Sequence, residues 1–326
     1  MAYTVRILQL PSEFSVHEDE TIVEAALNQN IEFPFSCASG TCGTCKCHLT
    51  RGSVSLLDNY SRFTLTDEER KRGLILACCA IPHSDCELVL NTATLQTEIL
   101  ECRVASIRKA THDIKIINIE RPNSGFPLFS AGQYADLSFS NLPYRSYSMA
   151  NRPGDPILEF HVRLSPEGRV SSFVHQQLAP GDAVRFKGPL GTAHLREQDR
   201  RPIIALAGGS GLGPIKSIIE TALFLKMRQP IHCYFGARDE RDLYYIDHFL
   251  ALRDSFPNFS FIPVLSEASG QTRRRTGFLA AAIKVDFNDL RGFKAYLAGP
   301  PIMVDTATQV LLDRGVLHQD IHADSF

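Results

Sequence analysis

Cysteine is the residue type best placed to do chemistry in this 326-residue chain. Cys37, Cys42 and Cys45 stand in the spacing Cys-x4-Cys-x2-Cys, and a fourth thiol follows downstream at Cys78 or its neighbour Cys79. Three thiolates on one short loop can converge on a small iron–sulfur cluster. The spacing is that of plant-type [2Fe–2S] ligation, so we expect such a cluster here.

Two other interpretations of these cysteines are a zinc site and simple burial of small apolar thiols. Zinc sites usually use paired Cys-x2-Cys knuckles, and this loop has one such pair beside a four-residue gap. Gly40 and Gly43 permit the tight turns that leave backbone N–H groups facing a cluster. We expect the cysteines outside the ligand set to be structural thiols, among them Cys47, Cys86, Cys102 and Cys233.

Two further motifs lie in the middle of the chain. Arg145-Ser146-Tyr147-Ser148 follows Leu-Pro-Tyr, and about 20 residues later comes Gly168-Arg169-Val170-Ser171. The second motif begins a predicted helix, where free N–H groups and the helix dipole can hold a pyrophosphate. Taken alone, the first motif is equally compatible with an exposed arginine and a core tyrosine on a strand.

A glycine-rich turn, LAGGSGLGP, spans residues 206–214, with Gly208, Gly209, Ser210 and Gly211 at its centre. It follows a predicted strand and opens a predicted helix, the place where doubly wound sheets bind dinucleotides. The alternative is a plain strand-to-helix connection. Two more predicted strands end at residues that could bind a nucleotide, one at Arg238 and the other at Gly299-Pro300.

These motifs require three kinds of scaffold. Residues 1–97 predict an α+β domain with a capped helix after Thr21, where Glu24 completes a capping box. Residues 98–199 carry many short strands and one helix near 171–177, which indicates an antiparallel β-barrel. Residues 200–326 alternate strands with helices, including one predicted over 243–255, which indicates an α/β doubly wound sheet. We interpret the run Arg273–Arg275 as a solvated loop.

Composition excludes several classes of function. The chain is 44% hydrophobic and 21% charged, as in globular proteins, and has no apolar run of the roughly 20 residues that span a bilayer. The first 97 residues carry 7 Lys+Arg against 12 Asp+Glu, and the rest carry 27 against 24, so no nucleic-acid footprint is present. With no signal-peptide pattern, we expect a cytoplasmic protein.

With these motifs in order, the chain resembles the ferredoxin–flavin–NAD(P)H reductases that serve ring-hydroxylating dioxygenases and other multicomponent oxygenases. The resemblance implies a β-grasp ferredoxin domain, a six-stranded FAD-binding barrel and a Rossmann-like NAD(P)H-binding domain. Leu-Ala-Cys is the family form of the fourth ligand, which implies Cys78. The resemblance also implies that Arg145 neutralises the flavin phosphate, that Tyr147 stacks on the ring and that Ser148 hydrogen-bonds near N5.

The same resemblance indicates what the enzyme does. Hydride passes from NADH to FAD, and single electrons leave through the cluster to a terminal oxygenase or its ferredoxin. The alternative acceptor is a deoxysugar dehydratase. Glu267 favours NADH over NADPH because a carboxylate repels a 2′-phosphate. Ala298 replaces a family cysteine beside the nicotinamide, and Phe326 either shields the flavin or is simply the end of the chain.

Overall fold

The structure is a computed structural model that describes residues 2–9, 13–29, 31, 33–35, 40, 43–58, 60–62, 64–90, 99–122 and 126–326. The chain divides after residue 97 into two compact units, one N-terminal and the other reaching Ser325. Among the described helices, none is both long enough and apolar enough to cross a lipid bilayer.

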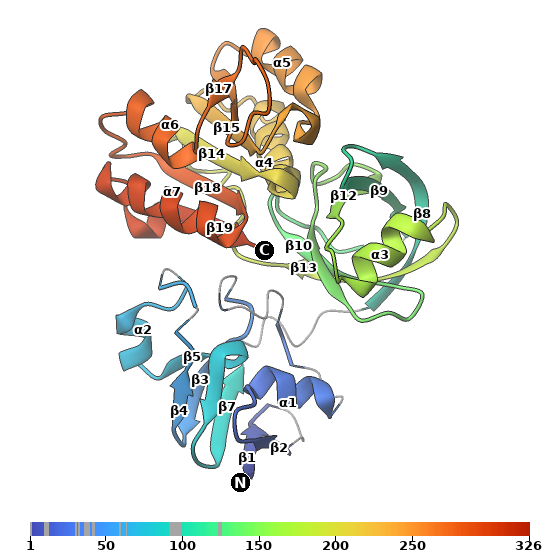
Figure 1. The fold of residues 1–326 in the computed structure, drawn as a ribbon, viewed down its shortest axis with the longest axis vertical. Coiled ribbons are helices and arrows are strands. Elements are labelled where there is room, and N and C mark those ends of the chain that lie inside the picture. Colours follow the sequence, from blue (N-terminus) through green and yellow to red (C-terminus); the bar gives the residue numbers. More distant parts are fainter. Residues whose placement is uncertain are drawn as a thin grey trace. The chain divides into compact units, whose positions relative to one another are not determined.

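The N-terminal unit is built on a five-stranded sheet of order β2-β1-β7-β3-β5 (Figure 1). Its strands are β1 (Ala2–Ile7), β2 (Glu13–His17), β3 (Lys46–Arg51), β5 (Leu74–Leu76) and β7 (Cys86–Leu90). β1 runs antiparallel to β2 and parallel to β7, whereas β3 runs antiparallel to β7. This mixed sheet is the predicted β-grasp arrangement. A second, two-stranded sheet joins β4 (Val54–Leu56) to β6 (Ala80–Pro82).

Local sequence signals explain the helices of this unit. α1 (Ile22–Asn28) begins after Thr21, whose hydroxyl accepts from the Glu24 N–H while the Glu24 carboxylate accepts from the Thr21 N–H. This is the predicted capping box. α2 (Asp67–Lys71) begins with the same box at Thr66 and Glu69. α1 buries its apolar side, formed by Ile22, Val23, Ala25 and Ala26, in the core of the sheet.

The second unit begins with a six-stranded antiparallel sheet of order β11-β10-β13-β8-β9-β12. Its strands are β8 (Ile99–Lys109), β9 (Ile114–Glu120), β10 (Tyr134–Phe139), β11 (Arg145–Ser148), β12 (Ile157–Arg163) and β13 (Ala183–Leu190). A bridge between Met149 and Phe160 joins the two edges, so the sheet nearly closes into the predicted barrel. Within its described residues the barrel carries one helix, α3 (Arg169–Gln176), drawn in light green in Figure 1.

A six-stranded parallel sheet completes the second unit, in the order β17-β16-β15-β14-β18-β19. Its strands are β14 (Ile203–Gly208), β15 (Ile231–Ala237), β16 (Phe259–Leu265), β17 (Arg275–Thr276), β18 (Lys294–Gly299) and β19 (Ile321–Ser325). One core joins the sheet to α4 (Leu212–Phe224) and α5 (Ile246–Ser255). A second core joins it to α6 (Leu279–Asp286) and α7 (Pro301–Asp313). Helices therefore cover both faces, as predicted for a doubly wound sheet.

The barrel and the parallel sheet share buried side chains. Ile114, Ile116, Ala131 and Leu195 from the barrel region belong to the same apolar cluster as α4. Packing across this boundary explains why residues 98–325 form one compact unit. The order of strands reverses between β14 and β18, and ligands of doubly wound sheets bind at such a reversal.

Two expectations about this unit were wrong, and its last strand was not predicted. The helix predicted over 243–255 begins only at Ile246, because Tyr245 adopts a left-handed backbone with φ 59°. The end of the chain is a strand, β19, paired in parallel with β18. The predicted solvated loop at 273–275 is anchored, since Arg274 pairs with Glu240 and Arg275 with Asp286.

Candidate functional site

The cysteine cluster is described at two of its four predicted ligands, because Cys37 and Cys42 lie outside the described residues. Cys45 precedes β3, and Cys78 lies in the 3-10 helix Ala77–Cys79. Their Sγ atoms are 3.2 Å apart, and both residues are buried. A disulfide requires about 2.05 Å, so these thiols are not bonded to each other.

This Sγ–Sγ separation fits ligation of one metal ion. Two thiolates on a tetrahedral ion with bonds of about 2.3 Å stand about 3.8 Å apart, so a small adjustment of either side chain suffices. Cys79 has a different neighbour. A Cβ added to Gly40 would lie 2.7 Å from the Cys79 Sγ, so this thiol packs against the backbone of the cysteine loop. The Cys79 Sγ also lies 3.7 Å from the Cys78 Sγ, and it is the 3.2 Å contact with Cys45 that supports Cys78 as the ligand.

Another cysteine near the predicted cluster, Cys47, is buried in the core. Cys47 is 2% exposed on β3, and burial, followed by the nearby Cys45 and Cys86, raises the pKa of its thiol. Among the described cysteines, Cys45, Cys47, Cys86, Cys102 and Cys233 form no disulfide.

The Arg-Ser-Tyr-Ser motif forms β11, which pairs with β10. The Nη1 of Arg145 donates to the Tyr144 carbonyl at 2.8 Å. Because the side chain is exposed, the rest of the guanidinium remains accessible to a phosphate. Ser146 donates to Asp136. Tyr147 packs edge-on against Phe139 with 6.4 Å between ring centroids, and burial raises the pKa of its hydroxyl to about 12.

The last residue of this motif contacts the far end of the chain. The Ser148 Oγ donates to the Asp324 carboxylate at 3.1 Å, across 176 residues of sequence. Asp324 lies on β19, the strand that the sequence did not reveal. β19 pairs with β18 in a register that sets Ser325 opposite Gly299, so the C-terminus runs beside the turn that follows β18. Phe326, the next residue, is 48% exposed.

The second flavin motif opens α3 as predicted. Gly168 is the N-cap, and Arg169, Val170 and Ser171 form the first turn. A Cβ on Gly168 would lie 2.5 Å from the Ser171 Oγ, so glycine is required where the chain enters the helix. The Ser171 Oγ donates to the Gly168 carbonyl and accepts from the Ser165 N–H, which leaves the first N–H groups of the helix available to an anion.

The glycine-rich turn and the turn after β18 touch backbone to backbone. A Cβ on Gly211 would lie 2.1 Å from the Ala298 carbonyl oxygen, and a Cβ on Gly299 would lie 2.9 Å from the Gly208 carbonyl oxygen. Gly209 adopts φ +56°, and Gly209–Gly211 form a 3-10 turn that leads into α4. The two turns form a glycine-rich cradle at the strand reversal, and such a cradle fits a dinucleotide diphosphate.

The second turn of α4 is fastened to the barrel. The Ser217 Oγ donates to the Asn151 carbonyl at 2.6 Å, and the Lys216 Nζ donates to the Ala150 carbonyl at 3.1 Å. Both side chains are buried. Since residues 150–151 follow β11 within three residues, these bonds fix the distance between the flavin strand and the dinucleotide turn. Sequence motifs gave no indication of either residue.

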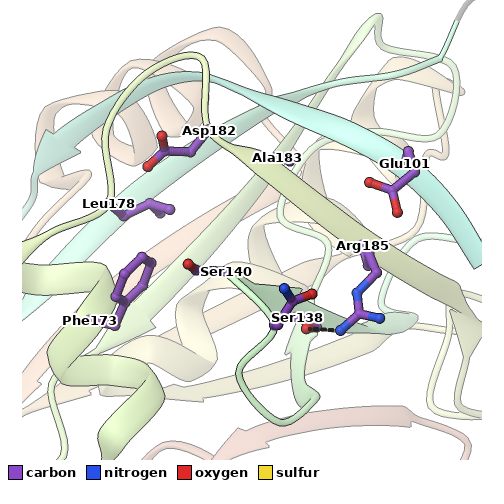
Figure 2. A pocket seen from close by; sticks show the side chains of 9 residues that line it. Glu101, Ser138, Ser140, Phe173, Leu178, Asp182, Ala183 and Arg185 are labelled. Atoms are coloured by element: carbon purple, nitrogen blue, oxygen red, sulfur yellow. Dashed lines mark hydrogen bonds between the residues drawn. The ribbon is translucent and has the colours of Figure 1, made fainter.

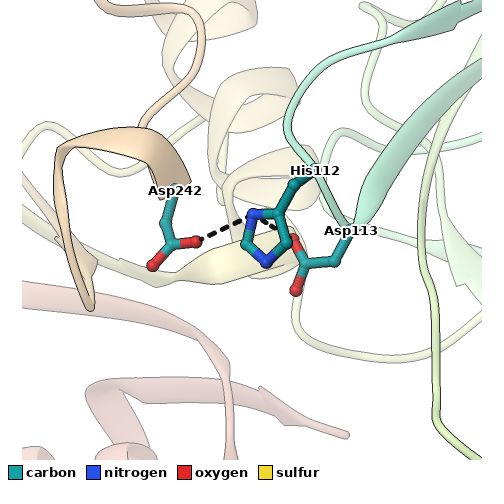
Figure 3. Close-up of side chains that lie close together, drawn as sticks. All are labelled: His112, Asp113 and Asp242. Carbon is teal, nitrogen blue, oxygen red and sulfur yellow. Dashed lines mark ion pairs between the residues drawn. The ribbon is translucent and has the colours of Figure 1, made fainter.

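Arg238 lies in a charge cluster between barrel and sheet. Its guanidinium is 3.4 Å from an Asp113 carboxylate oxygen and 3.5 Å from an Asp242 oxygen, and Arg163 pairs with the same Asp113 oxygen at 2.8 Å. His112 Nδ1 lies 3.3 Å from Asp242 (Figure 3). Burial opposes ionisation of Asp113, but Thr111 and Arg163 lower its pKa. The carboxylates of this charge cluster can therefore hold two arginines, Arg163 and Arg238, beside the glycine-rich cradle.

Glu267, the residue predicted to select NADH, is exposed directly after β16. Its N–H donates to the Arg238 carbonyl at 2.8 Å, so the two predicted nucleotide-binding residues are backbone neighbours at the carboxyl ends of β15 and β16. Pro300 is the N-cap of α7 and follows Gly299. The structure therefore brings together the nucleotide-binding candidates at one edge of the sheet.

A separate pocket of about 270 Å³ opens on the barrel between the β10–β11 turn, α3 and β13 (Figure 2). Arg185 extends into it and donates to the Ser138 Oγ at 3.0 Å. Glu101 and Asp182 add carboxylates, while Phe173 and Leu178 form the apolar wall. None of the predicted site residues lines this pocket.

Comparison with known proteins agrees with this organisation. Residues 5–83 match the 2Fe-2S iron-sulfur cluster binding domain, residues 101–195 the oxidoreductase FAD-binding domain and residues 205–309 the oxidoreductase NAD-binding domain. These matches confirm the predicted domain types and the predicted cofactors, a [2Fe–2S] cluster, FAD and NAD(P)H.

Full-length relatives share all three parts. A reductase component of naphthalene 1,2-dioxygenase/salicylate 5-hydroxylase systems from Ralstonia sp is 37% identical, over 94% of this chain and 93% of its own. A CDP-6-deoxy-L-threo-D-glycero-4-hexulose-3-dehydrase reductase from Yersinia pseudotuberculosis is 34% identical, over 96% and 95%. The crystal structure of an Amycolatopsis cytochrome P450 reductase superposes with a TM-score of 0.71 at 32% identity, covering 99% and 98%. The chain belongs to the family of ferredoxin–NAD(P)⁺ reductase components, oxidoreductases that carry electrons from NAD(P)H through FAD and a [2Fe–2S] cluster.

Proposed function

We propose that this chain is the NADH-dependent reductase component of an oxygenase system, and that it delivers single electrons to a terminal oxygenase or to an intermediary ferredoxin. The Ralstonia relative, which is a reductase component of two such systems, supports this acceptor. The observation that carries the proposal is the fastening of α4 to the barrel through Lys216 and Ser217, because hydride transfer requires the two cofactor sites to be held at a fixed distance.

We assign residues 1–97 to the ferredoxin domain, 98–199 to the FAD-binding barrel and 200–326 to the NAD(P)H-binding domain. Cys45 and Cys78 ligate one iron of the cluster, and Cys37 and Cys42 supply the other two thiolates. The reduced thiols of Cys47, Cys86, Cys102 and Cys233 suit a reducing compartment, and we place the protein in the cytoplasm.

The residues of the flavin site have distinct tasks. Arg145 and the first N–H groups of α3, over Gly168–Ser171, bind the phosphates of FAD. Tyr147 supports the ring system. Ser148 presents its hydroxyl oxygen, as a hydrogen-bond acceptor, to the reactive edge of the ring, and the Asp324 carboxylate orients that hydroxyl by accepting its O–H hydrogen bond at 3.1 Å.

In the nucleotide site, backbone N–H groups and an arginine provide the positive charge that binds the diphosphate. The N–H groups of Gly209–Gly211 and the Arg238 guanidinium bind the diphosphate, Gly299 and Pro300 admit the nicotinamide, and Glu267 accepts from the ribose hydroxyls. Bound FAD supplies the chemistry of accepting a hydride from NADH and releasing electrons one at a time. The protein contributes orientation, fixed spacing and exclusion of water.

Two acceptor assays with one variant test the electron path. Cys45→Ser removes one thiolate from the cluster, so NADH-driven reduction of cytochrome c is expected to fall at least 100-fold. Ferricyanide reduction, which flavin alone supports, is expected to stay within twofold of wild type. Cys102→Ser, a change of a buried barrel thiol, is the control and keeps both activities. Equal loss of both activities in Cys45→Ser contradicts the proposed route.

A second acceptor deserves the same assay, because the Yersinia relative is a dehydrase reductase of similar identity and coverage. Anaerobic NADH oxidation is therefore measured with candidate oxygenase components and with a sugar-nucleotide dehydrase. Turnover that depends on the oxygenase supports our proposal, whereas turnover that depends only on the dehydrase replaces it with the alternative.

A further inference from the structure

A buried polar network crosses from the barrel to the nucleotide-binding part of the second unit. His161, on β12, has a side chain that is 1% exposed. Its Nε2 is 2.8 Å from the Glu159 carboxylate, and its Nδ1 is 2.9 Å from the Tyr244 hydroxyl. Tyr244 is 5% exposed and lies just before α5. None of these residues belongs to the flavin or nucleotide motifs.

The Tyr244 hydroxyl has a second neighbour. It is 3.3 Å from the carbonyl oxygen of Gly209, the residue with φ +56° in the dinucleotide turn. That carbonyl also accepts from the Leu212 N–H and therefore points back into the helix, on the side away from the N–H groups that face a diphosphate. The hydroxyl carries one proton, so it can donate to His161 or to Gly209, but not to both.

The protonation state of the His161 imidazole decides whether the Tyr244 hydroxyl donates to His161 or to the Gly209 carbonyl. Glu159 is a carboxylate at neutral pH, so the His161 Nε2 must carry a hydrogen to satisfy it. A neutral His161 then has a bare Nδ1, which accepts the Tyr244 hydroxyl and leaves the Gly209 carbonyl without it. An imidazolium has a hydrogen on Nδ1 as well, donates to the Tyr244 oxygen, and turns the hydroxyl toward Gly209.

The surroundings keep His161 neutral in the protein without nucleotide. Burial lowers the pKa of its imidazole, and the Glu159 carboxylate only partly opposes this. Lys216 from α4 and Arg108 from β8 add positive charge, while Tyr245 stacks on the ring at 5.7 Å. A diphosphate bound at the turn shifts His161 toward its protonated form, because an anion close to the network favours the charged form of histidine.

We propose that His161 and Tyr244 are positioning residues that couple dinucleotide binding to proton uptake: binding favours the imidazolium, which turns the Tyr244 hydroxyl onto the Gly209 carbonyl and holds the turn in its binding conformation. This inference rests on the proposed nucleotide site. It follows by linkage that acid strengthens binding, by at most tenfold per pH unit for one proton.

Calorimetry of NAD⁺ binding to the oxidised holoenzyme tests the coupling. Titrations at pH 7 in phosphate and in Tris, whose ionisation heats differ, give the number of protons taken up. We expect a clear fractional uptake in the wild type and a Kd that rises between pH 6 and pH 8. His161→Gln and Tyr244→Phe are each expected to lose at least half of the uptake and to flatten the pH dependence of Kd.

His248→Gln is the matched control, because His248 also faces a carboxylate, that of Glu220 at 2.6 Å, yet is 39% exposed. It is expected to keep the wild-type uptake. Visible spectra report whether each variant retains FAD and cluster, and Tyr244→Phe carries the test if His161→Gln does not. NAD⁺ binding with equal uptake in the wild type and both network variants, or with none in the wild type, overturns the coupling alone. Failure of the wild type to bind NAD⁺ overturns the proposed function as well.

Discussion

Glu159→Gln is the change that best measures how strongly the barrel and the nucleotide-binding part are joined. Burial opposes ionisation of Glu159, but hydrogen bonds from His161 and Tyr245 and the charge of Lys216 lower its pKa from 4.5 to about 2. Each pKa unit corresponds to about 1.4 kcal/mol, so the folded protein favours the carboxylate by about 3 kcal/mol. The substitution keeps the shape of the side chain and removes this contribution.

The sign follows from the direction of the shift. A carboxyl whose pKa is lower in the folded than in the unfolded state stabilises the fold above its unfolded value of about 4.5, and this stabilisation is lost as pH falls toward 2. At pH 7 the variant is therefore expected to lose about 3 kcal/mol of unfolding free energy. For a unit of this size that corresponds to a lower Tm by about 5–10 °C. The difference from wild type shrinks below pH 4.5.

Thermal unfolding of the holoprotein, followed by flavin fluorescence between pH 3 and pH 8, is the assay. Glu240→Gln is the control, because Glu240 also accepts from a hydroxyl and an arginine, at Thr272 and Arg274, but its side chain is 48% exposed. An exposed pair contributes less than about 1 kcal/mol. Equal Tm losses in the two variants, or a loss in Glu159→Gln that does not depend on pH, refute the reasoning.

Two further predictions concern the nucleotide site. Gly211→Ala places a Cβ about 2 Å from the Ala298 carbonyl oxygen, so the two turns must separate. The rate of flavin reduction by NADH, measured by stopped flow, is therefore expected to fall about 10- to 100-fold. Gly270→Ala, where a Cβ meets no atom within 4 Å, is the control, and an unchanged rate in Gly211→Ala contradicts the cradle. Glu267→Arg exchanges a repelling carboxylate for a phosphate-binding fork beside Arg238, so the kcat/KM ratio of NADH to NADPH is expected to fall at least 10-fold, and an unaltered ratio removes Glu267 from the specificity site.

The sequence was sufficient wherever short-range chemistry decides the structure. The capping box at Thr21 predicts the start of α1, the alternation of strands and helices predicts the doubly wound sheet, and the glycines of the 206–214 turn predict its place between β14 and α4. The thiol spacing that begins at Cys37 indicated the cluster. Each signal is either a short motif or a repeat of local elements along the chain, and backbone geometry links it to the structure.

Long-range contacts needed the tertiary structure. Ser148 and Asp324 are 176 residues apart, and His161 and Tyr244 are 83 apart, so no periodicity or motif joins them. The helix expected from residue 243 starts only at Ile246, because Tyr245 has a left-handed backbone; its hydroxyl donates to Glu159 and its ring stacks on His161. Local sequence determined which elements form and which cofactors they serve. Packing of the barrel against the sheet decided which side chains meet between those cofactors, because burial of charged groups is tolerated only where distant partners satisfy them.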